Sequence, residues 1–504
     1  MVRKLLKKII NSFNKKKINE DNTKYLWEKR KAELLEKVRN KKNNRPDPVY
    51  TQPRKTRKLK NNENLVVSKP KVKVAEKRPR QKLVLENKRR KEQRNKSLIS
   101  VEWNSAEFHI EPSEGKTRFH DLDLSRELMH AIYDVGFKYC TTIQQEILKN
   151  TLSGKDATGR AETGTGKTAA FLITILDRLQ KNNLNEERRH ASPRALILAP
   201  TRELVLQITS DAKKLAKYLP VQILSVFGGI DYRKQRSLLN GNVIDIIVAT
   251  PGRLLDFYKK KGLFLNKVEI LVIDEADRML DMGFIPDVRN IIRSTPPKAK
   301  RQTLFFSATL SSDINRLVSY WTKDAVHVNI NPKQIAVKSV EQIVYIVTNK
   351  EKFCVLYNLL IQRKLQKVLV FTNRKDETRE LEGLLKRYKI NCSVISGDVE
   401  QRKRILTLNA FKEGKIPILI ATDVAGRGIH IEGISHVINY TLSEDAEDYV
   451  HRIGRTGRAG AAGVSISFAS EDDSFQIPSI QEYIGRKLNC VYPSHDLLKP
   501  LPKI

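Results

Sequence analysis

Short apolar runs alternate with stretches of helical spacing from about residue 119 onward, and they fall into two series. The first series comprises the runs at 195–200, 245–250, 270–276 and 303–309. The second, which begins after Asn331 and Pro332, comprises the runs at 340–347, 367–373, 416–423 and 436–440. Near-continuous apolar strands separated by helices are typical of a parallel sheet that is covered on both faces. The pattern therefore predicts an α/β protein with two domains in tandem.

The change of pattern along the chain also predicts where these domains begin and end. We expect a first α/β domain at 101–330, a linker at 331–338 and a second α/β domain at 339–488. A tail at 489–504 follows, and an extension without sustained apolar periodicity, 1–100, comes before the first domain.

The N-terminal extension carries most of the net charge. Residues 1–100 hold 34 basic and 10 acidic side chains, so they contribute +24 of the formal +36 of the whole chain. Such a segment buries too little apolar surface to offset its ordering entropy, so we expect a basic arm that is mostly disordered. An excess of positive charge of this size favours a polyanionic partner.

One part of the arm differs from the rest, because five apolar residues recur there at helical spacing. A short amphipathic helix is one interpretation, and it would touch a membrane surface or a partner. A transient helix without a role is the other. The residues are Leu5, Leu6, Ile9, Ile10 and Phe13.

Composition excludes several classes of protein. No window approaches the ~18 consecutive apolar residues of a membrane span, and the basic start lacks the unbroken apolar stretch of a secretory signal. The four cysteines, Cys140, Cys354, Cys392 and Cys490, stand far apart. This spacing argues against a disulfide framework and a cysteine zinc site, and it fits a reducing cytoplasm. We therefore expect a cytoplasmic protein without integral membrane association.

The motif AETGTGKT at 161–168 precedes an apolar helical stretch. Gly164 and Gly166 would let the backbone wrap a phosphate at a helix N-terminus. Lys167 would then reach the β- and γ-phosphates, and Thr168 would bind Mg²⁺. The general P-loop pattern has glycine where Ala161 stands, so the match is one residue short. ATP and Mg²⁺ are the expected cofactors.

A second motif supports the interpretation as an ATP site, because Asp274 and Glu275 directly follow the apolar run at 270–273. An aspartate in this place holds Mg²⁺, and the adjacent glutamate orients or deprotonates the attacking water. An acidic helix N-terminus without a catalytic role is the alternative, since carboxylates are favoured there. The pairing with Lys167 at the end of another parallel strand favours the catalytic reading.

The second domain contributes the basic segment HRIGRTGR at 451–458. Arg455 and Arg458 are three residues apart, so they lie on one face of a helical turn and can converge on one anion. A solvated basic turn is the alternative. Arginines that reach the γ-phosphate from a second domain would make hydrolysis depend on domain closure, and such groups are worth ~10³–10⁵ in rate.

Together these motifs resemble those of the DEAD-box ATP-dependent RNA helicases over about residues 119–490. The resemblance implies two RecA-like P-loop domains and RNA-stimulated ATP hydrolysis. The other matching segments are GFKYCTTIQ at 136–144, PTRELVLQ at 200–207, Gly228-Gly229, TPGR at 250–253, SAT at 307–309, FTNR at 371–374, SGDVEQRKR at 396–404 and ATDVAGRGIHI at 421–431.

The resemblance also assigns roles to individual residues. Phe137 would stack on adenine and Gln144 would read its edge, with Phe119 as the isolated upstream aromatic. The phosphate-binding residues would be Ala161, Glu162, Thr163, Gly164, Thr165, Gly166, Lys167 and Thr168. Catalysis would rest on Lys167, Asp274, Glu275, Arg455 and Arg458. The RNA contacts would be Pro200, Thr201, Arg202, Gly228, Gly229, Thr250, Pro251, Gly252, Arg253, Thr372, Asn373, Arg374, Gly397 and Thr422. Coupling would involve Asp277, Ser307, Thr309 and Asp423.

One departure from the family pattern concerns the nucleotide. Most members have aspartate where His430 stands, and that aspartate is implicated in holding the ribose, so His430 is a candidate for the same contact. The ending DLLKPLP and the segment RGIHI are most similar to one bacterial branch of the family. This similarity implies work in mRNA turnover beside the endoribonuclease RNase E and other components of the RNA degradosome.

One leading function and three alternatives are compatible with the sequence. The leading one is an RNA-stimulated ATPase with a monomeric core that melts short RNA duplexes without sequence preference, since its Gly-, Thr- and Arg-rich loops would position a phosphate chain without reading bases. Alternatives are an ATP-gated RNA clamp, or a remodeller of RNA in ribosome assembly, and a DNA helicase with the same ATPase core. Glu275 and the two arginines favour turnover over clamping.

Overall fold

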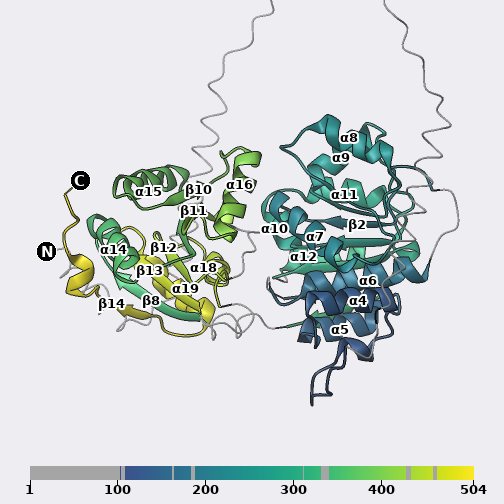
Figure 1. The fold of residues 1–504 in the computed structure, drawn as a ribbon, viewed down its shortest axis with the longest axis horizontal. Helices are drawn as coiled ribbons and strands as arrows, with labels where there is room; N and C mark the ends of the chain where they lie inside the picture. Colours follow the sequence, from purple (N-terminus) through teal and green to yellow (C-terminus); the bar gives the residue numbers. More distant parts are fainter. Residues whose placement is uncertain are drawn as a thin grey trace, which may run out of the picture. The chain divides into compact units, whose positions relative to one another are not determined.

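The computed structural model describes residues 103, 108–161, 164–182, 188–309, 311–330, 340–426, 433–457 and 463–503. These residues form two α/β domains, and each is built around its own seven-stranded sheet (Figure 1). Every strand pair in both sheets is parallel. The predicted α/β fold with two tandem parallel-sheet domains is therefore confirmed. The predictions for the arm and for the linker at 331–338 lie outside the described residues.

The first domain alternates strands with helices along the chain. Its strands are β1 (Ala157–Arg160), β2 (Ala195–Leu198), β3 (Ile223–Val226), β4 (Ile246–Ala249), β5 (Ile270–Ile273), β6 (Gln302–Ser307) and β7 (Val326–Asn329). Its helices are η2 (Phe119–Asp121), α4 (Arg126–Val135), α5 (Thr142–Thr151), α6 (Lys167–Lys181), α7 (Arg202–Leu215), α8 (Tyr232–Gly241), α9 (Pro251–Lys259), α10 (Ala276–Asp281), α11 (Ile285–Arg293), η3 (Lys298–Lys300) and α12 (Ser312–Trp321).

The second domain repeats this alternation. Its strands are β8 (Val340–Ile346), β9 (Val368–Thr372), β10 (Cys392–Ile395), β11 (Ile418–Thr422), β12 (His436–Asn439), β13 (Gly463–Ala469) and β14 (Asn489–Val491). Its helices are α14 (Asn349–Gln362), α15 (Lys375–Arg387), α16 (Gln401–Lys412), α17 (Asp423–Gly426), α18 (Ala446–Ile453), η5 (Ser474–Gln476), α19 (Ile477–Ile484) and η6 (His495–Leu498).

The two sheets have equivalent topologies. Strand order is β3-β4-β2-β5-β6-β1-β7 in the first sheet and β10-β11-β9-β12-β13-β8-β14 in the second. When the strands of each domain are counted from its own first strand, the two orders are identical. Because all strands run in one direction, their carboxyl ends share one edge of each sheet, which is where ligands bind in open α/β folds.

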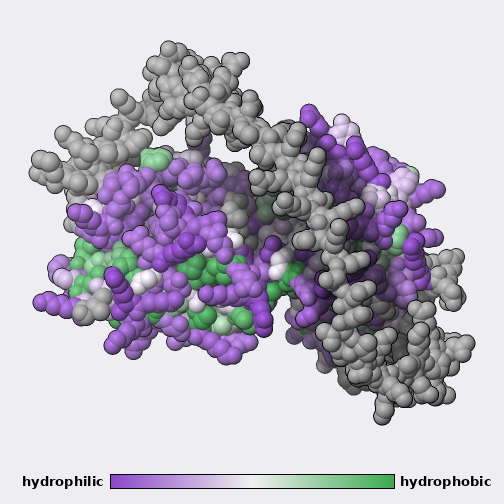
Figure 2. Space-filling model, turned by 90° about the horizontal axis from the view of Figure 1, so that it is seen from above, coloured by the Kyte–Doolittle hydropathy of each residue, from purple (hydrophilic) through white to green (hydrophobic). Residues whose placement is uncertain are grey.

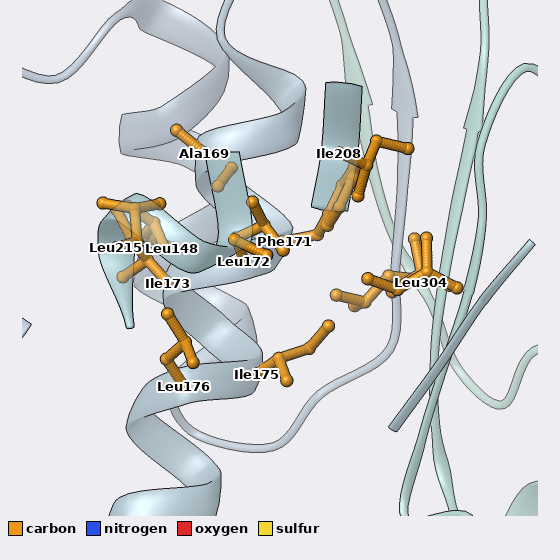
Figure 3. Packing of buried hydrophobic residues seen from close by; sticks show 14 of the residues in the cluster. Leu148, Ala169, Phe171, Leu172, Ile173, Ile175, Leu176, Ile208, Leu215 and Leu304 are labelled. Atoms are coloured by element: carbon orange, nitrogen blue, oxygen red, sulfur yellow. The ribbon is translucent and has the colours of Figure 1, made fainter. Parts of the chain in front are cut away.

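Alternate residues along the strands enter opposite faces of the first sheet. On β6, Leu304 and Phe306 belong to the core beneath α4–α7, whereas Phe305 belongs to the core beneath α9–α12. Helix α6 is buried along most of its length, and Phe171 and Leu172 in it have no exposed surface. Figure 3 shows these side chains packed against those of neighbouring helices and of β6. This two-sided burial explains why the strands read as continuous apolar runs.

Some strands carry sequences that the apolar pattern does not reveal. Strand β1 reads ATGR, and Gly159 in it lies directly under the ring of Phe306. A Cβ at Gly159 would stand 2.7 Å from Cδ1 of that ring, so the close packing of the two strands requires glycine.

Residues 489–503, which the sequence suggests form a tail, continue the second domain. Strand β14 pairs with β8 at the edge of the second sheet. Beyond it η6 packs on α14, where the side-chain amide of Asn358 donates to the carbonyl oxygens of Leu497 and Lys499, at 3.0 Å each.

The face of the described chain that Figure 2 shows is mostly hydrophilic. Figure 2 shows one face, on which hydrophobic residues of the described chain gather in small groups between polar ones. None of the helices in the described part of the chain is long and apolar enough to cross a bilayer.

Candidate ATP site and RNA-contacting motifs

The phosphate-binding loop lies between β1 and α6, at the carboxyl edge of the first sheet. Gly164 and Gly166 have φ angles of +90° and +99°, which glycine adopts without the cost that a side chain would add. Lys167 is the first residue of α6 and is buried, and its Nζ donates to the carbonyl oxygen of Ala161 at 2.5 Å. Thr168 follows on the first turn. Glu162 and Thr163 lie outside the described residues.

Gln144 connects the segment GFKYCTTIQ at 136–144, which we expect to recognise adenine, to this loop. Its Oε1 accepts from the backbone N–H of Thr141 at 2.8 Å, which completes a capping box at the start of α5. Its Nε2 donates to the carbonyl oxygen of Gly166 at 3.2 Å, and Thr141 Oγ1 donates to the carbonyl oxygen of Thr165 at 2.8 Å. Both ends of the amide are therefore engaged, and the loop is attached to α5 as well as to α6.

The two aromatic residues expected near adenine lie together. The rings of Phe119 and Phe137 are stacked, with centroids 5.9 Å apart. Phe119 is fully buried, whereas Phe137 is half-buried and lines a cavity of about 690 Å³ that Gln144 and Lys167 also line. Phe137 is thus placed to meet a ligand directly, and Phe119 supports it from the core.

Asp274 and Glu275 follow β5 at the same edge of the sheet, and both are buried. Burial raises the pKa of the Asp274 carboxyl to about 7, although the charge of Lys167 opposes the shift. Glu275 has a φ angle of +52°, a strained value for a residue with a side chain, and its Oε2 lies 3.4 Å from Arg278 Nη1. Such strain is common where a fold holds a functional side chain in place.

The donors at this edge fit a magnesium ion. Mg²⁺ prefers hard oxygen ligands, and it takes one or two from the protein while phosphate and water supply the rest. Asp274 supplies a buried carboxylate whose charged form is disfavoured by burial alone, and Thr168 supplies a hydroxyl from the first turn of α6. A bound cation would offset the cost of keeping this carboxylate ionised.

Asp277, the last residue of the sequence DEAD at 274–277, joins two motifs. Asp277 Oδ2 accepts from the backbone N–H groups of Ala308, at 2.8 Å, and Thr309, at 3.0 Å. The hydroxyl of Thr309 also lies 3.4 Å from it. Ser307, at the end of β6, is buried. The predicted coupling motif is thus bonded to the helix that follows Asp274 and Glu275.

A side chain of the second domain reaches this site. Arg455 lines the 690 Å³ cavity together with Lys167, Asp274 and Glu275. It also lines an adjoining cavity of about 550 Å³ with Lys167 and Glu275. Its Nε donates to the carbonyl oxygen of His451 at 3.1 Å, which fixes its direction. Arg458 and His430 lie outside the described residues.

The residues expected to contact RNA in the first domain lie where strands give way to helices. Thr201 caps α7, and its Oγ1 accepts from the N–H of Leu204. The guanidinium of Arg202 lies against the Gly228-Gly229 pair, since a Cβ at Gly229 would stand 2.2 Å from Arg202 Nη1. Pro200, Thr250, Pro251 and Gly252 are also at strand-to-helix junctions, and Arg253 Nη1 donates to the carbonyl oxygen of Ile230.

Their counterparts in the second domain differ in exposure. Thr372 and Thr422 end two paired strands and are register partners, and both are buried. Arg374 is exposed and pairs with Asp376. Gly397 faces the ammonium end of Lys375, since a Cβ at this glycine would stand 3.5 Å from both Cε and Nζ of that side chain.

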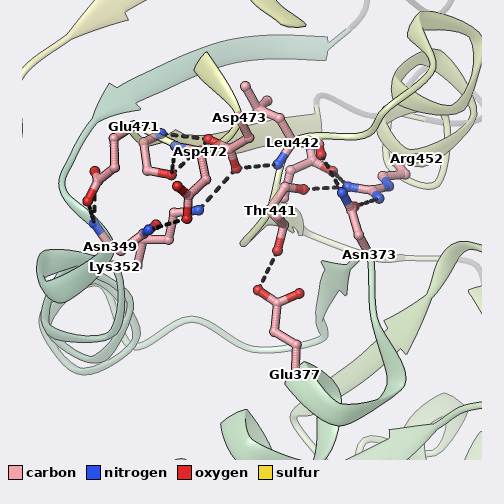
Figure 4. A network of polar contacts seen from close by, with 12 residues as sticks. Asn349, Lys352, Asn373, Glu377, Thr441, Leu442, Arg452, Glu471, Asp472 and Asp473 are labelled. Atoms are coloured by element: carbon pink, nitrogen blue, oxygen red, sulfur yellow. Dashed lines mark hydrogen bonds and ion pairs between the residues drawn. The ribbon is translucent and has the colours of Figure 1, made fainter. Parts of the chain in front are cut away.

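Asn373 belongs to a buried network that sequence reasoning did not find (Figure 4). The centre is Arg452, which has 2% of its surface exposed. Its guanidinium donates twice to Asp423, once to Asn373 Oδ1 at 2.6 Å and once to the carbonyl oxygen of Thr441 at 2.7 Å. Asn373 Nδ2 in turn donates to the carbonyl oxygen of Leu442 at 2.8 Å. Arg452 therefore positions two of the predicted motif residues and the segment that carries Arg455.

Residues from motifs of both domains also bond directly to each other. Glu203 Oε1 lies 2.6 Å from Arg404 Nε and accepts from Gln401 Nε2 at 3.1 Å. Arg202 Nη1 donates to Gln401 Oε1 at 3.0 Å. These side chains come from the PTRELVLQ and SGDVEQRKR segments, so the contact links the predicted RNA-contacting surfaces of the two domains.

Two family models match this arrangement. A DEAD/DEAH box helicase model matches residues 141–317, and a helicase conserved C-terminal domain model matches residues 351–460. Among solved structures, S. cerevisiae Dbp5 bound to RNA and ADP BeF3 is 32% identical, with a TM-score of 0.66 over 75% of this chain and 96% of that one. Mss116p bound to ssRNA and AMP-PNP is 28% identical, with a TM-score of 0.69 over 77% and 82%.

The chain belongs to the DEAD-box family of ATP-dependent RNA helicases, enzymes that bind RNA and hydrolyse ATP. Within that family it is similar to proteins named ATP-dependent RNA helicase RhlB. The one from Pseudomonas putida is 59% identical over 394 residues, which are 78% of this chain and 99% of that protein. The one from Pseudomonas aeruginosa is 57% identical over 394 residues, with the same coverage. The expected resemblance to this branch is thereby confirmed.

Proposed function

We propose that this helicase hydrolyses ATP with Mg²⁺ in the cavity lined by Lys167 and Arg455, and that it thereby melts short RNA duplexes without sequence preference. The observation that carries the proposal is that Arg455, from the second domain, lines one cavity with Lys167 and Glu275, from the first. A phosphate chain in that cavity would meet cations from both domains. Hydrolysis would then require the two domains together.

The position of each residue in the cavity suggests its role in ATP binding or hydrolysis. Lys167 would move from the Ala161 carbonyl oxygen to the β- and γ-phosphates, and Thr168 with Asp274 would hold Mg²⁺. When bound, the metal ion neutralises charge on the phosphate oxygens. Glu275 would orient the attacking water and accept its proton, while Arg455 would stabilise the charge that develops on the γ-phosphate. Phe137 and Gln144 would bind adenine. We also propose that His430 contacts the ribose of ATP, as the aspartate at this position does in most members of the family.

Coupling to RNA would run through hydrogen bonds already present. Asp277 links the helix after Glu275 to Ala308 and Thr309, so a shift at the carboxylates would move the SAT segment. The Thr, Gly and Arg residues at the strand ends would hold the RNA backbone, and Asn373 and Thr372 would contribute through their main chain because their side chains are engaged or buried. Contacts to the backbone carry no sequence information.

Phosphate release tests the enzyme assignment. Full-length protein is assayed with RNA, with single-stranded DNA and without nucleic acid, and duplexes of increasing length are assayed for strand separation. We expect RNA to stimulate release over many turnovers, and we expect separation to fail as duplexes lengthen. Release that stops after one turnover would favour the ATP-gated clamp, and equal stimulation by DNA would favour a DNA helicase.

Two substitutions separate binding from chemistry. Lys167→Ala should abolish ATP binding and hydrolysis together, because it removes the cation that faces the phosphates. Glu275→Gln should keep ATP and RNA binding while hydrolysis falls by about 10²-fold or more, the usual size of a general-base contribution. Hydrolysis by Glu275→Gln at the parent rate would show that another group activates the water.

We also propose a cytoplasmic role in mRNA degradation together with RNase E. The similarity to proteins named RhlB supports this role. Co-purification of the full-length chain with RNase E, followed by decay assays on a structured transcript with and without ATP, tests it. Decay that proceeds equally well with the Glu275→Gln variant would contradict the role.

A further inference from the structure

A second groove in the first domain lies away from the ATP site. It has a volume of about 710 Å³, and it is formed by the ends of α11 and α12 and by the segment that leads into β6. These segments meet the sheet at the amino end of β6, whereas Asp274 and the phosphate-binding loop follow the carboxyl ends of strands. The groove therefore shares no residue with the cavities of the ATP site.

The rim of the groove is strongly basic. Arg289 and Arg293 are four residues apart on α11, so they project from the same face of the helix. Arg316 on α12 and Lys298 on η3 complete the rim. All four side chains are exposed, and the described lining residues of the groove include no carboxylate. In the described part of the chain none of the three arginines forms an ion pair, so their charge is available to a ligand.

The interior of the groove is apolar and carries one prominent aromatic ring. Leu317 and Trp321 on α12 are each 6% exposed. Tyr320, one turn after Arg316, is 68% exposed, which is unusual for so large a hydrophobic residue. A cationic rim around an apolar surface with an exposed ring matches the two parts of a nucleotide, the phosphate and the base.

Arg301 gives the groove a fixed shape. It is buried, and it donates to the carbonyl oxygens of Ile292, Pro296 and Trp321, at 3.3, 2.8 and 3.4 Å. One side chain thus ties together the end of α11, the following loop and the end of α12. The site is built before any ligand arrives, and little ordering entropy opposes binding.

We propose that this groove is a second RNA-binding site, which holds a single-stranded segment of the helicase's RNA independently of ATP. The three arginines would pair with phosphates, for which the guanidinium fork is well suited, and a base would stack on Tyr320. RNA fits better than an acidic protein segment, because a base stacks on an exposed ring whereas a carboxylate gains nothing from it. All lining residues belong to the first domain, so a strand bound here would stay attached through the ATP cycle.

The test uses the full-length chain without nucleotide. The variant Arg289→Gln/Arg293→Gln/Arg316→Gln is compared with Lys350→Gln/Arg387→Gln/Lys412→Gln, which removes the same charge from exposed positions on the second domain. For a single-stranded RNA of about 30 nucleotides, longer than the ~4–16 that one site covers, we expect the groove variant to lose affinity at least fivefold. The slope of log affinity against log salt should fall by about 2, because each phosphate contact contributes ~0.7. Equal losses for the two triple variants would overturn the proposal.

A second measurement does not depend on charge. RNA that carries 4-thiouridine is cross-linked to the nucleotide-free protein, and the modified peptides are mapped. We expect cross-links at Tyr320, and we expect Tyr320→Ala to remove them and to weaken binding of the long RNA about fivefold or more. ATP hydrolysis at saturating RNA should be unchanged, which also shows that the variant is folded. Absence of cross-links in this groove, or their displacement by polyglutamate but not by unlabelled RNA, would overturn the proposal.

Discussion

The guanidinium of Arg452 donates two parallel hydrogen bonds to the carboxylate of Asp423, 2.5 Å from Nε to Oδ1 and 2.6 Å from Nη2 to Oδ2. Only 2% of the arginine side chain and 20% of the aspartate side chain are exposed. Removing one partner of a buried pair leaves the other charge unpaired, which costs about 3–5 kcal/mol. We predict that Arg452→Gln lowers the free energy of unfolding by about 3 kcal/mol, near the lower limit because Asp423 keeps some contact with water.

Urea unfolding of the full-length chain measures this effect. Arg379→Gln is the matched control, because Arg379 pairs with Asp398 at 2.9 Å in the same domain but both side chains are exposed. Exposed pairs contribute little to stability. Equal shifts of the two midpoints would mean that the Arg452 network does not stabilise the second domain.

A second prediction concerns Gln144, which bonds to Thr141 with its oxygen and to the phosphate-binding loop with its nitrogen. Glutamate in its place keeps the acceptor that caps α5 but loses the donor to the Gly166 carbonyl oxygen. We predict that Gln144→Glu lowers ATP affinity about tenfold while the thermal midpoint changes little, since leaving the partly buried Gly166 carbonyl oxygen without its donor costs ~1–3 kcal/mol.

Titration of ATP binding by calorimetry measures the loss. Glu351→Gln is the control, because Glu351 occupies the equivalent capping-box position at the start of α14, with no phosphate-binding loop beside it. ATP affinity that survives Gln144→Glu intact would show that the bond to Gly166 does not shape the loop.

The stacking of His130 predicts how the first domain responds to acid. Its ring lies between Tyr218, with centroids 3.8 Å apart, and Trp103, at 4.8 Å. Burial lowers the pKa of His130 below its ordinary value of 6.5; the charge of Asp134 opposes the shift, and that of Lys217 adds to it. As the pH falls, His130 is therefore protonated at a higher pH in the unfolded chain than in the folded one. The stability that neutral His130 contributes is fully present above about pH 6.5 and is lost as the pH falls toward the folded-state pKa.

We therefore predict that the thermal midpoint falls between pH 7 and about pH 5.5, and that His130→Phe reduces this fall while keeping the stack. His109, which is exposed, is replaced in the same way as a control. A pH dependence that His130→Phe leaves unaltered would assign the acid sensitivity to other groups.

The last prediction concerns the basic extension. Its +24 should add non-specific affinity for RNA through counterion release, so deletion of residues 1–100 should weaken RNA binding and flatten its salt dependence. ATP hydrolysis at saturating RNA should stay nearly constant, because every assigned catalytic residue comes later in the chain. A shorter truncation of residues 1–17 removes the apolar stripe but keeps most of the charge. If it weakens RNA binding as much as the full deletion, a discrete N-terminal site carries the affinity.

The sequence predicts the fold well where buried strands consist of aliphatic and aromatic residues, and poorly where buried strands carry glycine, threonine or serine. Strands β2, β4 and β5 consist of Ala, Ile, Leu and Val, and β6 carries Leu304, Phe305 and Phe306 at its centre, so the continuous apolar runs alone reveal them. Strand β1 is invisible to that pattern, because its sequence ATGR has a glycine where Phe306 and Ile147 leave no room for a side chain and a threonine that bonds to His327 on the neighbouring strand. Strand β13 is similar, since its buried serines, Ser465 and Ser467, interrupt the apolar run.

The candidate site is likewise predictable from the sequence only in part. Local sequence indicates the phosphate-binding loop and Asp274-Glu275, because AETGTGKT is a contiguous motif before an apolar helical stretch and Asp274 directly follows the apolar run at 270–273. Arg452 gives no such signal, since its partners Asp423, Asn373 and Thr441 are separated from it by 29, 79 and 11 residues. Only the parallel pairing of β9, β11 and β12 brings them together, so the role of Arg452 depends on the tertiary fold.

The order of the second sheet limits how the protein can be dissected. The matched helicase segment ends at residue 460, yet β13 begins at Gly463 and lies between β12 and β8. A fragment cut at residue 460 would also lose β14, so β8 would have no strand beside it. Its unpaired backbone groups, and those of β12, would form open edges at which chains aggregate. A fragment intended for crystallisation or binding assays must therefore extend through η6, to Lys499 or beyond.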